Sequence, residues 1–172
     1  AYFLTVISPT LNLQVGDVKS VPLIVEQRDI VESMVHCCTD LSHNDWDSFE
    51  TSWDFKRHPL VRGAATVAEA FAAWEAECDA RFNQLKANEE KLNRIFINIY
   101  GLQDELTSEV ENKDVTVRKA DLGRDSRSLI FYAVGCMFGR YSLDVDGLAY
   151  AGGEWDASKY STFLPDADGI LP

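Results

Sequence analysis

The stretch that decides the fold is "TVAEAFAAWEAECDARFNQLKANEEKLNRIFINIYG", which runs from Thr66 to Gly101. Thr66 and Glu69 match the capping-box pattern, in which each side chain accepts a hydrogen bond from the backbone N–H of the other residue. No glycine or proline follows until Gly101, a residue type that suits the left-handed end of a helix. The stretch therefore predicts a single helix of about 35 residues, about 52 Å long.

The apolar seam of this predicted helix is interrupted. Arg81 and Asn88 fall on the seam, and a regular coiled coil rarely carries both. We expect either two packed ends with a wetter middle or a break near Ala87 and Asn88. The seam residues follow a 3-4 spacing: Phe71, Trp74, Cys78, Leu85, Leu92, Ile95 and Ile99. We expect the C-terminal seam residues Leu92, Ile95 and Ile99 to pack on a second apolar helix, against Ile130, Val134 and Phe138.

The rest of the chain predicts a mainly α fold with a short β-rich N-terminal part. "YFLTVI", "LNLQV" and "VKSVPLIV" predict strands and turns within residues 2–25, and "EQRDIVESMVHCC" then changes to a helical period. "DSRSLIFYAVGCMFGRY" predicts the second helix, and residues from Ser142 onward are loop-rich, with a tight turn at Asp146-Gly147. The long helix should pack against one or two further helices. Its partner should bury Leu129, Ile130, Ala133, Val134, Met137, Phe138 and Tyr141.

These segments divide the chain into three parts. Residues 1–25 form a β region, residues 26–141 a helical spacer or bundle, and residues 142–172 a loop-rich C-terminal segment. The chain starts without methionine in an apolar run and closes on an apolar tetrapeptide. We interpret it as a piece of a longer protein, with a processed mature chain as the alternative.

Composition limits the function. The 172 residues hold 28 acids and 16 bases, for a net charge of -12, so the whole surface cannot be a DNA-binding face. A local basic patch, or a larger parent that supplies positive charge, remains open. Cys37, Cys38, Cys78 and Cys136 form no CxxC pair and are interpreted as reduced core thiols of a cytoplasmic protein, with a disulfide framework or metal site as the alternative. No apolar run approaches the roughly 20 residues that cross a bilayer.

The motif search finds no catalytic constellation. His36, Cys37 and Cys38 are consecutive, and adjacent helical side chains diverge too far to share one metal ion. Asp144 and Asp146 begin like a calcium loop, but Leu148 stands where the next ligand is needed, so a simple turn is preferred. Neither a phosphate-binding loop nor a nucleophile elbow is present.

Two surfaces remain as candidate sites. The first is basic, and its lysines and arginines would contact a DNA backbone, with an ordinary solvated face as the alternative. Its residues form two clusters in the sequence: Lys56 and Arg57, beside His58, and then Arg118, Lys119, Arg124 and Arg127, which Asp114, Asp121 and Asp125 dilute. The second is the acidic and aromatic stretch 40–55, where Trp46, Phe49 and Trp53 would share one face that docks a partner. The alternative is a short amphipathic helix that buries these aromatics in the core.

Longer strings resemble known DNA-modifying proteins. "SPTLNLQVGDVKSVPLIVEQRDIV" resembles the end of a target-recognition domain in restriction-modification proteins. "DWDSFETSWDFKRHPLV", "LNRIFINIYGLQDEL", "KDVTVRKADLGRD" and "SLIFYAVGCMFGRYSLDVDGLAYAGGEWD" resemble the C-terminal half of one family. That family is the adenine-specific DNA methyltransferases of bacterial phage-exclusion (BREX) systems, which are related to fused type II restriction-methylation enzymes. The resemblance covers nearly the whole chain.

The resemblance implies a parent enzyme that methylates the exocyclic amine of adenine with S-adenosylmethionine. The family's catalytic tetrapeptide is Asn/Asp-Pro-Pro-aromatic, and this sequence has no Pro-Pro pair and no glycine-containing cofactor motif. No catalytic, cofactor or metal residue is therefore carried over, and S-adenosylmethionine belongs to the parent. The implied role is a noncatalytic segment that positions the target-recognition domain, with DNA bound through the parent. The alternative is an interaction module that docks other defence-system subunits.

Overall fold

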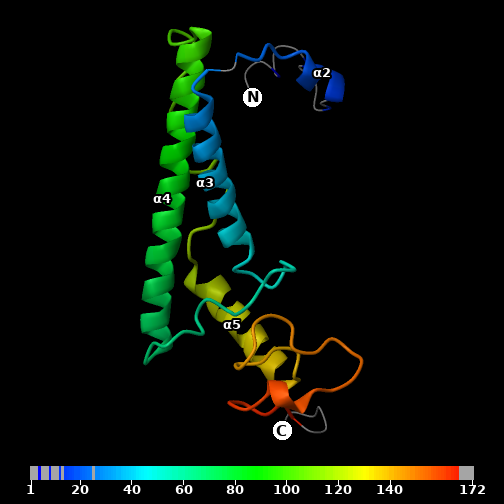
Figure 1. Cartoon of the computed structure of the whole chain (residues 1–172). Helices are drawn as coiled ribbons and strands as arrows, with labels where there is room; N and C mark the ends of the chain where they lie inside the picture. The colour runs from blue at the N-terminus through cyan, green and yellow to red at the C-terminus, as the bar shows by residue number, and fades with distance from the viewer. Residues whose placement is uncertain (1–3, 5–7, 9–11, 13, 25, 167–172) are drawn as a thin grey trace.

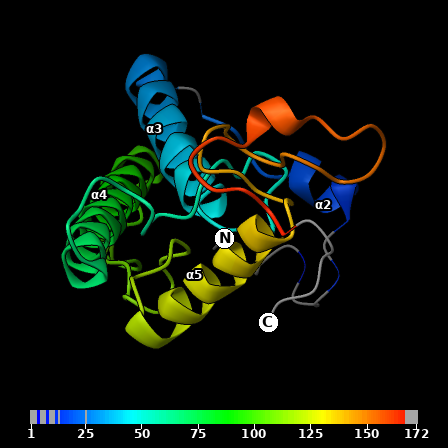
Figure 2. The same cartoon turned by 90° about the horizontal axis from the view of Figure 1, so that it is seen from below.

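The computed structural model describes residues 4, 8, 12, 14–24 and 26–166. The described helices are α2 (Val15–Lys19), α3 (Arg28–Trp46), α4 (Val67–Tyr100), α5 (Leu122–Met137) and the short 3-10 turn η1 (Ala157–Lys159). α3 and α4 run side by side in opposite directions, and α5 lies near the lower end of this pair with the loops that follow it (Figures 1 and 2). The mainly α prediction is confirmed.

The long helix begins and ends where the sequence predicts. Thr66 Oγ1 accepts a hydrogen bond from the Glu69 backbone N–H at 3.2 Å, and the Glu69 carboxylate accepts one from the Thr66 N–H at 3.2 Å. Gly101 closes the helix with a left-handed φ of 66°. α4 is one unbroken helix of 34 residues, about 51 Å long, so the predicted break near Ala87 and Asn88 is wrong.

The predicted wet middle of α4 is also wrong. Phe82 and Leu85 are buried there, in a cluster with Val115 and Val117. The segment around residues 110–117 returns along α4, and together with the second half of α3 it covers these side chains. The sequence pattern of α4 alone does not reveal this covering by distant segments. Arg81 tolerates burial because its guanidinium lies 3.3 Å from the carboxylate of Asp45.

The C-terminal stripe of α4 does not pack on α5, contrary to the prediction. Leu92, Ile95 and Ile99 are only half-buried. They belong to the C-terminal part of α4, which lies at the end of that helix distant from α5 (Figure 1). α5 instead reaches the first half of α4, where Leu129 packs against the cluster of Leu60, Ala70, Trp74 and Cys78.

The buried face of α5 also differs from the predicted one. Asp125, Tyr132 and Cys136 are buried, whereas Ile130 and Phe138 are 62% and 47% exposed. Of the other predicted core residues, Tyr141 is buried, Leu129, Val134 and Met137 are half-buried, and Ala133 is exposed. The sequence is apolar on nearly every side of this helix, so its period does not select one face.

The predicted β-rich N-terminal part is wrong within the described residues. Val15–Lys19 is a helix, residues 18–24 contain no strand, and only an isolated bridge between Tyr141 and Leu148 occurs in the described ranges. The predicted strand at residues 2–7 falls on positions outside the description, apart from Leu4. An alternating pattern forms a strand only beside a second backbone, whereas Gln14 and Asp17 form a local capping box that starts a helix.

Residues 142–166 form loops and η1. Gly147, at the predicted tight turn, has a φ of 77°, and the bridge between Tyr141 and Leu148 closes this turn. The Asp144 carboxylate accepts hydrogen bonds from the backbone N–H groups of Ser161 and Thr162 at 2.7 and 2.9 Å. Together with a hydrogen bond from the Thr162 hydroxyl, the largest contribution, they hold the pKa of Asp144 well below its usual range. Asp144 thus ties two loops together.

Candidate interaction surfaces

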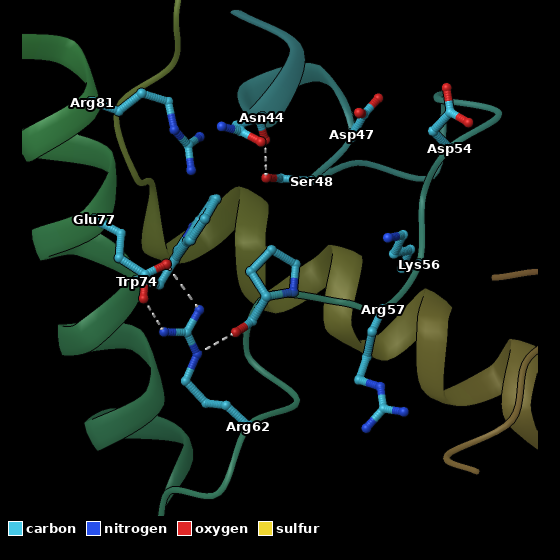
Figure 3. A pocket seen from close by; sticks show the side chains of 11 residues that line it. Asn44, Asp47, Ser48, Asp54, Lys56, Arg57, Arg62, Trp74, Glu77 and Arg81 are labelled. Carbon is cyan, nitrogen blue, oxygen red and sulfur yellow. Dashed lines mark hydrogen bonds and ion pairs between the residues drawn. The ribbon is translucent and has the colours of Figure 1, made fainter. Parts of the chain in front are cut away.

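Lys56 and Arg57, the first predicted basic pair, lie in a groove of about 640 Å³ (Figure 3). The groove runs between the end of α3, the loop that follows it, and α4. Lys56 is exposed, and the Arg57 guanidinium lies 3.5 Å from the Asp146 carboxylate. The Arg57 Nε is buried without a hydrogen-bond partner among the described residues. The groove is lined by Asn44, Asp47, Ser48, Asp54, Lys56, Arg57, Pro59, Arg62, Trp74, Glu77 and Arg81.

Most charge in this groove is balanced. Arg62 makes two hydrogen bonds to the Glu77 carboxylate, at 2.6 and 3.3 Å, as Figure 3 shows. Arg81 is paired with Asp45, which lies outside the groove lining. Lys56 has no ion pair among the described residues, and Arg57 has only a long one. The groove is therefore a mixed polar surface rather than a uniformly positive channel.

The second predicted basic cluster is mostly engaged within the fold. The Arg118 guanidinium Nε lies 4.0 Å from the Asp45 carboxylate, which also accepts a hydrogen bond from the Arg118 backbone N–H at 3.1 Å. The Lys119 ammonium lies 3.4 Å from the Asp79 carboxylate. Arg124 Nε donates to Asp125 at 2.6 Å. Arg127 is exposed and makes no hydrogen bond or ion pair in the described part of the chain. Of the cluster, Arg127 is thus the cation most available to an external anion.

The structure brings the two predicted surfaces together. The Arg118 guanidinium carbon lies 4.1 Å from the centre of the Phe49 ring and 6.0 Å from that of Trp46. Trp46 is 51% exposed, Phe49 is half-buried, and Trp53 is fully exposed on the turn that follows α3. The structure thus places neither tryptophan in the core, and the alternative of a buried aromatic helix is not what forms.

Two buried carboxylates organise the fold, and sequence reasoning missed both. Asp45 holds Arg81 and Arg118. Asp125 accepts hydrogen bonds from the indole N–H of Trp74 at 3.0 Å, the backbone N–H of Asp121 at 3.0 Å, and Arg124. Burial would raise the pKa of Asp125, but these hydrogen bonds outweigh burial and hold that pKa below its usual value. An acid in the last turn of a helix opposes the helix dipole, so the position of Asp45 was an available signal.

The buried histidine and thiols are inert at neutral pH. Burial lowers the pKa of His58 to about 4, and its Nδ1 accepts a hydrogen bond from the Leu60 N–H at 3.2 Å. Burial raises the pKa of Cys78 to about 11, which suppresses the reactive thiolate. All four cysteines are free, and Cys37 is exposed rather than in the core.

Neither metal-binding nor membrane-crossing features stand out in the described ranges. No three histidine, cysteine or acidic side chains gather there as a metal site would require. None of the helices described has the length and apolarity needed to cross a bilayer.

The fold and these surfaces define an acidic helical module in which the main polar clusters join helices to one another. No protein-family model matches the chain. An adenine-specific methyltransferase named PglX, from Lacticaseibacillus casei (strain Zhang), is 51% identical over 175 residues, covering 98% of this chain and 15% of the relative. An adenine-specific methyltransferase named BrxX, from Escherichia coli O9:H4 (strain HS), is 34% identical over 196 residues, covering 99% of this chain and 16% of the relative.

The chain is therefore homologous to one segment of these adenine-specific methyltransferases, which confirms the resemblance seen in its sequence. It spans 15% and 16% of the length of the two relatives.

Proposed function

We propose that this chain is a noncatalytic segment of an adenine-specific (N6) DNA methyltransferase of the BREX phage-exclusion type. In this proposal the segment positions the DNA target-recognition domain relative to the catalytic domain, and the parent supplies S-adenosylmethionine binding and methyl transfer. Homology to methyltransferase segments supports the class, and the lack of a Pro-Pro pair supports a role outside the chemistry. The DNA substrate makes the bacterial cytoplasm the expected location.

The observation that carries the positioning role is the connection at the tip of α4. The Tyr100 hydroxyl donates a hydrogen bond to the Pro22 carbonyl and accepts one from the Ile24 N–H at 3.2 Å. Residues 22 and 24 belong to the stretch that resembles the end of a target-recognition domain. Far along α4, Trp74 binds Asp125 of α5. α4 thus fixes the separation of these two regions.

This geometry suits an enzyme that extrudes its target base. Such an enzyme must hold the duplex while one nucleotide is rotated out of the stack, and small misplacements of the reacting groups lower the rate strongly. A helix stiffened by a second helix along much of its length keeps a recognition domain at a fixed distance. The proposed contribution of this segment is therefore to turnover and site selection.

A proline scan in a full-length methyltransferase that contains this segment tests the role. Ala87→Pro places proline at an exposed site inside α4, where it removes a hydrogen bond and kinks the helix. Val67→Pro is the matched control, because proline is tolerated at the first helical position. We expect Ala87→Pro to lower adenine methylation by roughly tenfold or more and to leave S-adenosylmethionine binding intact.

Tyr100→Phe is the second variant, because it removes the hydroxyl contacts at the helix tip without disturbing the helix. It should lower methylation in the same direction, by a smaller factor. Full methylation activity in both Ala87→Pro and Tyr100→Phe would refute the positioning role.

A docking module for other defence-system subunits is the second candidate function, favoured by the exposure of Trp53. A fully exposed tryptophan beside acidic side chains is the kind of residue that anchors a protein interface. Under this function, Trp53→Ala abolishes co-purification of a subunit, and Lys56→Glu leaves it unchanged. Under the first function, Lys56→Glu weakens DNA binding and lowers the salt slope by about one, and Trp53→Ala has no effect on DNA.

A further inference from the structure

The outward face of α5 carries an apolar stripe that the described elements cover only in part. Ile130, Val134 and the C-cap residue Phe138 follow one another at intervals of four residues, so they lie along one side of the helix. Val134 is half-buried, and Phe131 adjoins Ile130. Phe131 is 70% exposed and Ile130 62% exposed. These four residues are called the α5 stripe below. Figure 2 shows α5 along the margin of the molecule.

The stripe continues into a shallow hollow beyond the helix. A hollow of about 400 Å³ beside Phe138 is lined by Arg140, Leu148, Tyr150 and Ala151, and Leu148 is 53% exposed. Scattered apolar residues on a surface need no explanation, but a contiguous apolar patch marks an interaction site. The stripe and the hollow together form such a patch.

Positive charge stands at both ends of the α5 stripe. Arg127 lies one turn before Ile130 and Phe131, is exposed, and makes no ion pair in the described residues. Arg140 follows Phe138 closely and is also exposed. The one acid of α5, Asp125, is buried and bonded to Trp74. A chain of net charge -12 thus presents its apolar stripe between two cations.

This charge arrangement argues against a second copy of the chain as the occupant. Two stripes packed antiparallel bring Arg127 of one copy against Arg140 of the other, and two parallel stripes bring identical arginines together. Both arrangements place like charges in contact, which opposes association. An occupant that complements the stripe carries acidic residues at both ends of an apolar face.

We propose that the α5 stripe docks an amphipathic helix from another part of the same longer methyltransferase polypeptide. The apolar face of that helix fills the stripe, which is about 12 Å long because Phe138 lies eight residues after Ile130. Acidic residues beyond the two ends of that face meet Arg127 and Arg140. This inference rests on the proposed function. Its further support is that the aligned segment is 15% and 16% of the relatives, so most of their length lies outside it.

Thiol labelling tests the docking directly. Phe131→Cys is made in the 172-residue chain and in a full-length methyltransferase that contains it, and maleimide labelling at position 131 is followed by peptide mass spectrometry. Glu75→Cys, at an exposed polar site on α4, is the matched control. We expect position 131 to react roughly tenfold or more slowly in the full-length protein than in the chain alone. Position 75 should react at similar rates in both.

A charge variant tests the complementarity. Arg127→Glu in the full-length protein should raise the labelling rate at position 131 toward that of the isolated chain. Lys56→Glu, a charge reversal away from the stripe, should leave that rate unchanged.

Three results overturn the proposal. The first is equal labelling of position 131 in both proteins. The second is protection of the isolated chain that grows with its concentration, which assigns the stripe to a second copy. The third is protection that requires added duplex DNA. The labelling readout does not depend on methylation, so a failed positioning role would show as active Ala87→Pro and Tyr100→Phe enzymes with position 131 still protected.

Discussion

Replacing Asp45 by alanine should strongly destabilise the chain. The side chains of Asp45 and Arg81 are 8% and 12% exposed, and Arg81 Nη1 lies 3.3 Å from Asp45 Oδ1. Removing the carboxylate leaves a buried guanidinium without its counter-ion and the Arg118 N–H without its acceptor. Loss of one partner of a buried pair lowers the free energy of unfolding by about 3–5 kcal/mol. We expect about 3, because Arg81 keeps its contact with the Trp74 ring, whose centre lies 5.3 Å away.

A double-mutant cycle separates the pair from its surroundings. Arg81→Met alone should also destabilise, and Asp45→Ala/Arg81→Met should recover about 1–3 kcal/mol relative to the sum of the single variants. Asp40→Ala is the matched control, since Asp40 is exposed on the same helix, and should change stability by less than about 0.5 kcal/mol.

The measurement is urea unfolding of the 172-residue chain at low and high salt. The Asp45 effect should persist at high salt, because buried pairs are screened little. Additive single variants, or an Asp45→Ala effect as small as that of Asp40→Ala, would refute the reasoning.

Three further predictions concern single residues. Thr66→Ala removes the cap of α4 and should lower the unfolding free energy by about 1 kcal/mol in urea. Gly135→Ala places a Cβ 2.6 Å from the buried Tyr141 ring and should cost about 1–3 kcal/mol, whereas Gly123→Ala, with its nearest neighbour at 3.5 Å, should be neutral or slightly stabilising in thermal unfolding. The pKa of His58 is lowered to about 4 in the fold, so as pH falls the unfolded state binds this proton before the folded state does. The free energy of unfolding is therefore highest above about pH 6.5 and decreases as pH falls toward 4. His58→Gln should remove about 2 kcal/mol of the loss measured between pH 7 and pH 5.

Sequence reasoning succeeded where the signal is local. The cap at Thr66 and the stop at Gly101 act within one turn of the helix, so both ends of α4 were predictable from neighbouring residues alone. No strand forms at residue 12 or at residues 14–24, where strands were expected, for the opposite reason: a strand depends on a partner that no local pattern supplies.

Burial was predicted poorly because it depends on contacts between distant segments. Asp45 and Arg118 are 73 residues apart, and so no window of sequence joins the acidic aromatic stretch to the second basic cluster. On α5, the polar Asp125 is buried by its bonds to Trp74 and Arg124, whereas the apolar Ile130 is exposed. The candidate surfaces were thus located in the sequence. That Arg118 lies against Phe49, and that the second basic cluster, except for Arg127, is paired with acids of the fold, could be seen only in the three-dimensional arrangement.

The distribution of burial along α4 bears on how a positioning segment would work. Its fully buried residues lie between Ala70 and Leu85, and none lies beyond Leu85. The helix is therefore anchored firmly on the side near α5, and it is held more weakly toward the tip, where Tyr100 binds the backbone at residues 22 and 24. A rod fixed at one end and lightly held at the other sets distance well and angle less strictly. In the proposed methyltransferase, a domain attached at the tip would keep its separation from the catalytic part and still adjust its orientation on the duplex.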